Sequence, residues 1–553
     1  MNPKPPQNIL SRMIRHKRWL FFLLTLLAGL YILAPLHDFQ YQLSTGDHGR
    51  ELYSFKKALD GALPYRDYSW LYGPFLLYYY ALCYQLFGLS VQSILWGQNL
   101  LILSVGLLVY LTASLFMAPS LSMACALWYW AFRGTEFFYS YHNIGGVAAI
   151  LFILYLTFRY IKTSAFKNVF YGFLSLTVLL LIRLNMGLAI GLAYVSSLLM
   201  IDHVNKDIQR KKKASLYALL SMAALVISGL VYWALIHPLP PYVIDQTFPY
   251  THDQLAAEKI GPLETMVTFY IMLLEKIPSP VSRFIFGAGA FLSLMQIMVL
   301  HIRGKLSAPL KTQLTLVLPV LLLFFLFSLH EFIGSGVWFR FNWAFPVLLL
   351  LLFFLLHFLI ELNPLPDLKD TFRYGLFFIL AIGVSVKVLD IHHDIKKVKS
   401  LGQPIQAGRT RLYTVQSSEW IQTVNQASQY LRTNVPPDEK IFTFPHDSLY
   451  NFLSQRDNAT RQLALFAHTG IPEEQERAII ADLEHQHVNW VVESNRSRSK
   501  EFGMGAFGET HCRMIADYIK TNFELVAQMG EWTRPGGWAW DHGVRIWKRK
   551  SSP

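Results

Sequence analysis

The stretch STGDHGRELYSFKKALDGALPYRDYSWLYGPFLLYYY, residues 44–80, follows closely on the first long apolar segment of the chain. Between clusters of aromatic residues it places Asp47, His48, Arg50, Glu51, Arg66 and Asp67. Charged groups beside a lipid-soluble segment are costly and tend to be paired or functional. The position of this loop relative to the membrane therefore decides how the rest of the sequence is interpreted.

The composition is that of an integral membrane protein. Of the 553 residues, 53% are hydrophobic and only 15% are charged, whereas soluble domains carry about 25% charged residues. The 40 phenylalanines and 28 tyrosines suit membrane interiors and interfaces. The three cysteines, Cys83, Cys125 and Cys512, are far apart and predict neither a disulfide framework nor a zinc site.

Eleven segments are predicted to span the membrane as helices, given that a bilayer requires roughly 20 mostly apolar residues. They are residues 19–36, 91–117, 121–138, 144–161, 168–185, 187–203, 214–236, 283–302, 312–330, 341–360 and 372–389. The first segment also has the basic start of a signal peptide, but it exceeds the usual core of about 7–15 residues and no small-x-small site follows. We therefore interpret it as a retained helix.

Basic residues near the span ends orient these segments, because Lys and Arg prefer the cytoplasmic side. Arg12, Arg15, Lys17 and Arg18 precede the first span and place the N-terminus inside. The even-numbered connections carry further basic clusters, of which residues 206–213 are the densest. The net charge of +13 is thus largely a topology signal and not a sign of nucleic-acid binding. An odd number of spans places the C-terminus outside.

From about residue 390 the composition becomes that of a soluble protein. Residues 419–435 and 473–486 have the pattern of amphipathic helices, and residues 488–494 and 542–550 that of strands. Residues 512–529 change from a helical to a strand pattern, and a short strand follows the prolines at 436–445. Alternating strands and helices favour a small α/β domain. We predict a polytopic domain at 1–389 and an extracytoplasmic α/β domain at 390–553.

Two motifs in this C-terminal domain resemble a nucleotide-binding site and a metal site, but the surrounding sequence does not fit either one. GMGAFG, residues 503–508, matches the dinucleotide fingerprint, which must follow a strand directly and open a helix. Here a polar segment separates it from the preceding strand pattern. The HQH triplet at 485–487 is more typical of a solvated helix end than of a metal site. Neither motif contributes to the functional prediction.

The opening stretch falls in the first outer loop, about residues 37–90, which is longer than a simple connection. Its residues 73–88 are apolar but interrupted, which suits a helix lying in the interface plane. Asp47 could simply cap the helix that follows, because Asp is a favoured N-cap. An acid at the lipid boundary could instead act as a general base for an acceptor, provided that nearby cations stabilise a phosphate leaving group.

The same residues resemble the first loop of the GT-C membrane glycosyltransferases, in particular the bacterial branch of family 39 that includes protein mannosyltransferase-like and lipid A aminoarabinose transferase-like proteins. The shared features are an acid shortly after the first span, G-x-x-P-Y-R-D at 61–67, Y-G-P at 72–74, and an interfacial helix ending LFG at 86–88. The segment RFNWAFP at 340–346 and the soluble tail are also similar. The likeness in layout covers nearly the whole chain.

This resemblance implies an inverting transferase of the bacterial inner membrane that uses a polyprenyl-phosphate-linked sugar, with Asp47 as catalytic base. The acceptor would be a cell-envelope glycan, lipid or protein. Several members of the family have a second acid beside the first, whereas His48 follows Asp47 here and Glu51 lies one turn further on. The involvement of a divalent cation is left open. The predicted substrate-binding residues are Arg66, Tyr72, Glu136, His142, Asn143, His330, Glu331 and Arg340, with Arg340 the first choice for the donor phosphate.

Two other classes of function compete with the transferase. A transporter or flippase would also have many spans and intramembrane charges, but inverted repeats and paired broken helices are not evident. A scaffold that binds a lipid-linked glycan without catalysis would agree with a single loop acid. Consumption of the lipid-linked sugar distinguishes an enzyme from a scaffold, and movement of that lipid between leaflets identifies a flippase.

Overall fold

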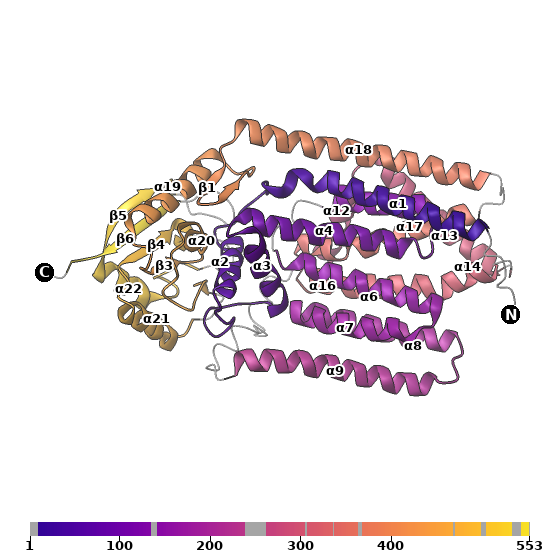
Figure 1. Ribbon diagram of the computed structural model, residues 1–553, viewed down its shortest axis with the longest axis horizontal. Coiled ribbons are helices and arrows are strands. Elements are labelled where there is room, and N and C mark those ends of the chain that lie inside the picture. The colour runs from indigo at the N-terminus through magenta and orange to yellow at the C-terminus, as the bar shows by residue number, and fades with distance from the viewer. Residues whose placement is uncertain are drawn as a thin grey trace, which may run out of the picture.

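The computed structural model describes residues 9–133, 141–237, 261–302, 304, 307–335, 337–362, 368–467, 471–498, 505–533 and 543–551. Its long helices form a bundle, and a smaller α/β domain covers one end of that bundle (Figure 1). Helix α1 (Ile9–Leu33) begins at the opposite end.

Eight of the described helical segments are long and apolar enough to cross a membrane. They are Lys17–His37 (α1 with a short 3-10 turn), α4 (Val91–Ala113), α6 (Asn143–Thr163), α8 (Leu184–Val204), α9 (Arg210–Ile236), α13 (Pro280–Ile302), the run Leu310–Ser328 that ends with α15 (Leu318–Ser328), and α18 (Lys369–Leu401). Two shorter apolar helices are α7 (Phe166–Ile182) and α17 (Phe345–Glu361). The chain is therefore a multi-pass membrane protein.

Each of these helices coincides with a predicted span to within a few residues, apart from a longer α18, and two further helices depart from the prediction. The predicted span 121–138 corresponds to α5 (Pro119–Phe132), whose 14 residues are fewer than the roughly 20 that a bilayer requires. Helix α12 (Pro262–Lys276) matches no predicted span, because acidic and basic residues flank its apolar centre. Helix α18 continues past residue 389 to Leu401. The total of eleven spans stays a prediction.

Burial separates the centre of the bundle from its edge. In the most apolar part of α6, 67% of the residues are buried inside the protein, whereas the corresponding share in α18 is 17%. Helices that are apolar on all sides are stable both in a protein core and against lipid. Helix α6 is thus central, and its first residues reach the end of the bundle where the first loop lies.

The first loop folds into two short helices between the bundle and the C-terminal domain (Figure 1). Helix α2 (Asp47–Leu59) and helix α3 (Pro74–Phe87) pack against each other. Pro74 stands at the first position of α3, where its fixed φ suits a helix start. The backbone N–H of Gly73 donates to the carbonyl of Ile182 at the end of α7, 3.0 Å away, which ties the loop to the bundle.

The C-terminal domain has the predicted α/β organisation. A mixed sheet has the strand order β3-β4-β6-β5, in which β3 runs parallel to β4 and the other neighbours are antiparallel. Its strands are β3 (Ile441–Phe444), β4 (Trp490–Ser494), β5 (Phe523–Met529) and β6 (Val544–Arg549), with helices α19 (Ser418–Asn434), α20 (Leu449–Ser454), α21 (Glu473–His485) and α22 (Arg513–Asn522). A small hairpin of β1 (Ile405–Ala407) and β2 (Thr410–Leu412) connects α18 to this domain.

The two motifs set aside above lack a functional context in the fold as well. The described part of the GMGAFG segment, residues 505–508, is followed by a turn before α22 begins at Arg513, so these glycines do not open a helix. The HQH triplet lies where α21 ends at His485.

Candidate active site

Asp47 is the first residue of α2, at the end of the bundle that faces the C-terminal domain. The N-cap of α2 is Gly46, so Asp47 does not occupy the cap position and its interpretation as the N-cap is wrong. The hydroxyl of Ser44 accepts the backbone N–H of Asp47 at 3.1 Å, which fixes the start of the helix. The Asp47 side chain is 18% exposed. Its carboxylate is therefore available at the margin of a buried site.

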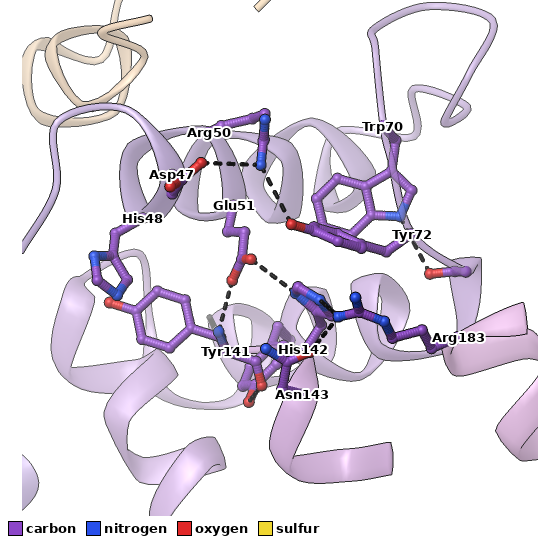
Figure 2. A network of polar contacts seen from close by, with 12 residues as sticks. Asp47, His48, Arg50, Glu51, Trp70, Tyr72, Tyr141, His142, Asn143 and Arg183 are labelled. Carbon is purple, nitrogen blue, oxygen red and sulfur yellow. Dashed lines mark hydrogen bonds and ion pairs between the residues drawn. The ribbon is translucent and has the colours of Figure 1, made fainter. Parts of the chain in front are cut away.

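Arg50 connects Asp47 to the aromatic part of the loop (Figure 2). Its Nη2 donates to Asp47 Oδ1 at 3.2 Å and lies 3.5 Å from the hydroxyl of Tyr72. The guanidinium is also 5.9 Å from the centre of the Tyr72 ring, within cation–π range. The buried guanidinium therefore forms an ion pair with the Asp47 carboxylate.

Glu51 is fully buried one turn further along α2 and binds the two residues that precede α6. Its Oε2 accepts the backbone N–H of Tyr141 at 2.7 Å, and its Oε1 lies 2.8 Å from Nδ1 of His142. On the other side of the ring, Arg183 lies 3.3 Å from His142 Nε2. Because a guanidinium can only donate, Nε2 accepts and Nδ1 carries the hydrogen that is donated to Glu51. The Tyr72 ring stacks on this imidazole at 3.4 Å.

Burial raises the pKa of Glu51 to about 8, while the nearby His48 and Arg50 charges oppose that rise. Burial also lowers the pKa of His142 well below 6.5, so this imidazole is neutral in the folded protein. The stability that His142 contributes is present above pH 6.5 and is lost as the pH falls below that value. The stability that Glu51 contributes has the opposite dependence: it is complete below pH 4.5 and declines as the pH rises to about 8.

Glu51→Gln should therefore abolish the part of the pH dependence that belongs to Glu51. Between about pH 6.5 and 8 the wild type should lose more thermal stability than the variant, although the variant should be less stable at the lower pH because its amide cannot accept both N–H groups. Unfolding temperatures of the purified proteins at several pH values test this. Glu474→Gln, at an exposed acid of α21, is the control. Parallel pH curves for wild type and Glu51→Gln would contradict the assignment.

Arg183, between α7 and α8, joins the start of α6 to the segment that follows α15. Its guanidinium donates to Asn143 Oδ1 at 2.6 Å and to Glu331 Oε2 at 2.7 Å. It also lies 4.6 Å from the centre of the Trp343 ring. Arg183 is thus paired with an acid from a distant part of the chain. Asn185 donates to the other oxygen of Glu331 at 2.5 Å, so this buried carboxylate is held on both sides.

The structure brings most of the predicted substrate-binding residues into this one network: Tyr72, His142, Asn143, His330, Glu331 and Arg340. The nitrogens of His330 and Arg340 each lie 3.8 Å from an oxygen of Glu331. Arg66 does not join them, because its half-exposed guanidinium is held by the neighbouring Asp67 at 2.7 Å. Glu136 lies outside the described residues. No group of three His, Cys, Asp or Glu side chains suited to a metal ion occurs among the residues that are described.

Two arginines that connect the network are absent from the predicted set. Arg50 was available in the opening stretch, and its i,i+3 spacing from Asp47 places both side chains on one face of α2. Arg183 has a clearer signal, because it is the only charged residue between Lys167 and Asp202. An isolated charge between two apolar segments indicates a paired or functional group.

No family model matches the chain, and no curated protein matches it in sequence. Solved structures do resemble it. ArnT from Cupriavidus metallidurans in the apo state has 13% identity and a TM-score of 0.57 over 95% of this chain and 97% of that one. The form bound to undecaprenyl phosphate has 12% identity with the same coverage and TM-score. The Archaeoglobus fulgidus oligosaccharyltransferase in complex with zinc and sulfate has 13% identity and a TM-score of 0.50 over 87% and 68% of the two chains.

ArnT and the archaeal oligosaccharyltransferase are both GT-C glycosyltransferases. The chain therefore has the GT-C fold, as the motifs of its first loop predicted. Within that class its layout agrees with that of ArnT along nearly the whole length of both chains, including the C-terminal domain.

Proposed function

We propose that the protein is a membrane glycosyltransferase that moves a sugar from a polyprenyl-phosphate-linked donor to an acceptor in the cell envelope. The observation that carries this proposal is the acid Asp47, held by Arg50 at the margin of a buried cationic network in a GT-C fold. The ArnT structure with undecaprenyl phosphate supports a lipid-linked donor. A transporter would not need a fixed acid on a loop braced against a soluble domain.

The proposed reaction is a direct displacement. Asp47 accepts the proton of an acceptor hydroxyl or amine, and the freed electron pair attacks the anomeric carbon of the donor sugar. The bond between that carbon and the phosphate oxygen breaks, and polyprenyl phosphate leaves with the electron pair. Attack from the face opposite the leaving group inverts the anomeric configuration. Arg340 and Arg183 would stabilise the growing phosphate charge, since guanidinium groups match phosphate oxygens in geometry.

We propose further that the site lies on the extracytoplasmic side of a bacterial inner membrane. The basic connection between α8 and α9 lies at the end of the bundle opposite the C-terminal domain (Figure 1). Lys and Arg in short connections favour the cytoplasm. The first loop and the C-terminal domain then face outward. Labelling of single cysteines introduced at exposed positions 208 and 474 with an impermeant reagent would test this orientation, because only position 474 should react in intact spheroplasts.

Purified wild type, incubated with a panel of polyprenyl-phosphate sugars and membrane extracts as acceptors, should consume one donor and release polyprenyl phosphate. Parallel assays with a chelator test for the involvement of a divalent cation. Reconstitution in liposomes separates the competing functions: a flippase would move the intact donor between leaflets, and a scaffold would bind it without turnover. Either of these results, without release of polyprenyl phosphate from any donor, would contradict the proposed reaction.

A further inference from the structure

The C-terminal domain packs directly against the residues that surround Asp47. The backbone N–H of Leu449, at the start of α20, donates to the carbonyl of Thr45 at 3.1 Å. The segment from His446 to Leu449 follows strand β3 and is fully buried in this seam. A soluble domain that only stabilised the bundle would not need to place its backbone on the two residues before Asp47.

Two glycines on either side of Asp47 make this contact feasible. A Cβ atom on Gly46 would lie 2.4 Å from His446 Nδ1 and 2.7 Å from Arg496 Nη1, and a Cβ atom on Gly49 would lie 2.3 Å from the backbone nitrogen of Leu449. Neither glycine has a positive φ. Their lack of a side chain is thus required by space, and the space is occupied by the C-terminal domain.

His446 of this domain lies next to the Asp47 carboxylate. Its Nε2 lies 3.9 Å from Asp47 Oδ1, the same oxygen that accepts from Arg50 at 3.2 Å. The imidazole is 1% exposed, and it packs edge-on against Phe466 with 4.8 Å between the ring centres. Arg496 lies over the same Phe466 ring at 5.7 Å. One carboxylate oxygen is therefore contacted from both sides of the seam by groups that are themselves fixed.

We propose that His446 is a positioning residue for Asp47, and that the C-terminal domain is for this reason a necessary part of the site. The kinetic part of this inference rests on the proposed function of Asp47 as base. The imidazole restricts the Asp47 carboxylate to one orientation. In that orientation the oxygen of Asp47 that takes the proton points toward the sugar acceptor. Misplacement of a catalytic group by about 1 Å can cost on the order of 100-fold in rate.

His446→Ala should lower kcat roughly 10- to 100-fold and leave the KM for the lipid-linked donor within about twofold, because the donor is not the group that His446 contacts. His446→Gln, which keeps a polar group near Asp47 Oδ1, should recover part of the loss. His485→Ala, at an exposed histidine of the same domain, is the matched control. A kcat of His446→Ala within twofold of wild type would overturn the positioning role.

Gly46→Ala tests the seam from the opposite side. The added methyl group forces His446 and Arg496 away from the loop, so we expect kcat to fall at least tenfold and the unfolding temperature to fall by a few degrees. Gly261→Ala is the control, because nothing lies within 4 Å of a Cβ atom at that glycine. Unchanged kcat and unfolding temperature in Gly46→Ala would show that the domain does not dock closely against Asp47.

A double-mutant cycle tests the contact without any assay of transfer. The unfolding temperatures of Asp47→Asn, His446→Ala and the double variant are compared with wild type in the full chain. If the side chains interact, the double variant loses less than the sum of the single losses, by about 2 °C or more. Additive losses would overturn the inference even if transfer is found. If the losses are non-additive but the protein transfers no sugar, the contact between His446 and Asp47 is supported and only the proposed function is rejected.

Discussion

Asp47→Asn should lower the rate of sugar transfer roughly 10²- to 10⁴-fold, the range expected on removal of a general base. Asparagine has the size of aspartate, and its carbonyl oxygen can still accept from Arg50, which lies 3.2 Å from Oδ1 in the wild type. The amide cannot take a proton from the acceptor. The loss should therefore appear in kcat, with little change in the KM for the donor, and a steady-state assay with the donor identified in the panel measures both.

Asp60→Asn is the matched control for this variant. Asp60 lies at the other end of α2, is half exposed, and pairs with Lys56 at 2.7 Å. It should transfer sugar at the wild-type rate. Asp47→Asn must also retain a wild-type elution profile in size-exclusion chromatography, which separates lost chemistry from lost folding. Transfer by Asp47→Asn within a few-fold of wild type would contradict the role of base and make Glu136 the next residue to test.

Arg183→Ala should have the largest effect on stability, about 3–5 kcal/mol of unfolding free energy. The substitution removes the cation that contacts Glu331 at 2.7 Å. Glu331 is buried, and its remaining contacts only partly offset the free energy needed to keep its charge away from water. It also removes the donor to Asn143 and the contact with Trp343. The apparent unfolding temperature in detergent should fall by several degrees, as measured by thermal denaturation.

Two further variants separate the charge from the geometry at Arg183. Arg183→Lys retains a cation but not the planar fork, so it should be intermediate. Arg183→Met combined with Glu331→Gln removes both charges and should be more stable than Arg183→Ala alone, since no unpaired charge stays buried. If the double variant is less stable than Arg183→Ala, the unpaired Glu331 charge is not the main cause of the stability loss in Arg183→Ala.

Much of the fold could be predicted from the chain because its signals are local. Apolar segments of span length predict membrane helices whatever their neighbours are, and α4, α6 and α8 appear within a few residues of the predicted bounds. The strands and helices of the C-terminal domain follow from periodicity in the same way. The helices differ most from the predicted spans where the local signal is mixed: α12 has an apolar centre with charged ends, and α5 is apolar but short.

Within the site, the sequence indicated the loops but not the partners within them. The first-loop motifs placed Asp47 and Tyr72 in one region, and both belong to the network. Arg66 has the same motif-based support, yet its neighbour Asp67 keeps it at the surface. An ion pair with a sequence neighbour, such as that of Arg66 with Asp67, can keep a charged side chain out of the network.

The sequence by itself determined that the chain is a multi-pass membrane protein with a soluble C-terminal domain and a polar, aromatic first loop, because length, hydropathy and periodicity are properties of short segments. Only the tertiary structure decided which polar side chains meet. Arg183 and Glu331 are 148 residues apart, and Glu51 and His142 are 91 apart. Such pairs form because the packed helix ends exclude water there, and a buried polar or charged group is stable only next to a partner. The same reason places His446 of the C-terminal domain beside Asp47.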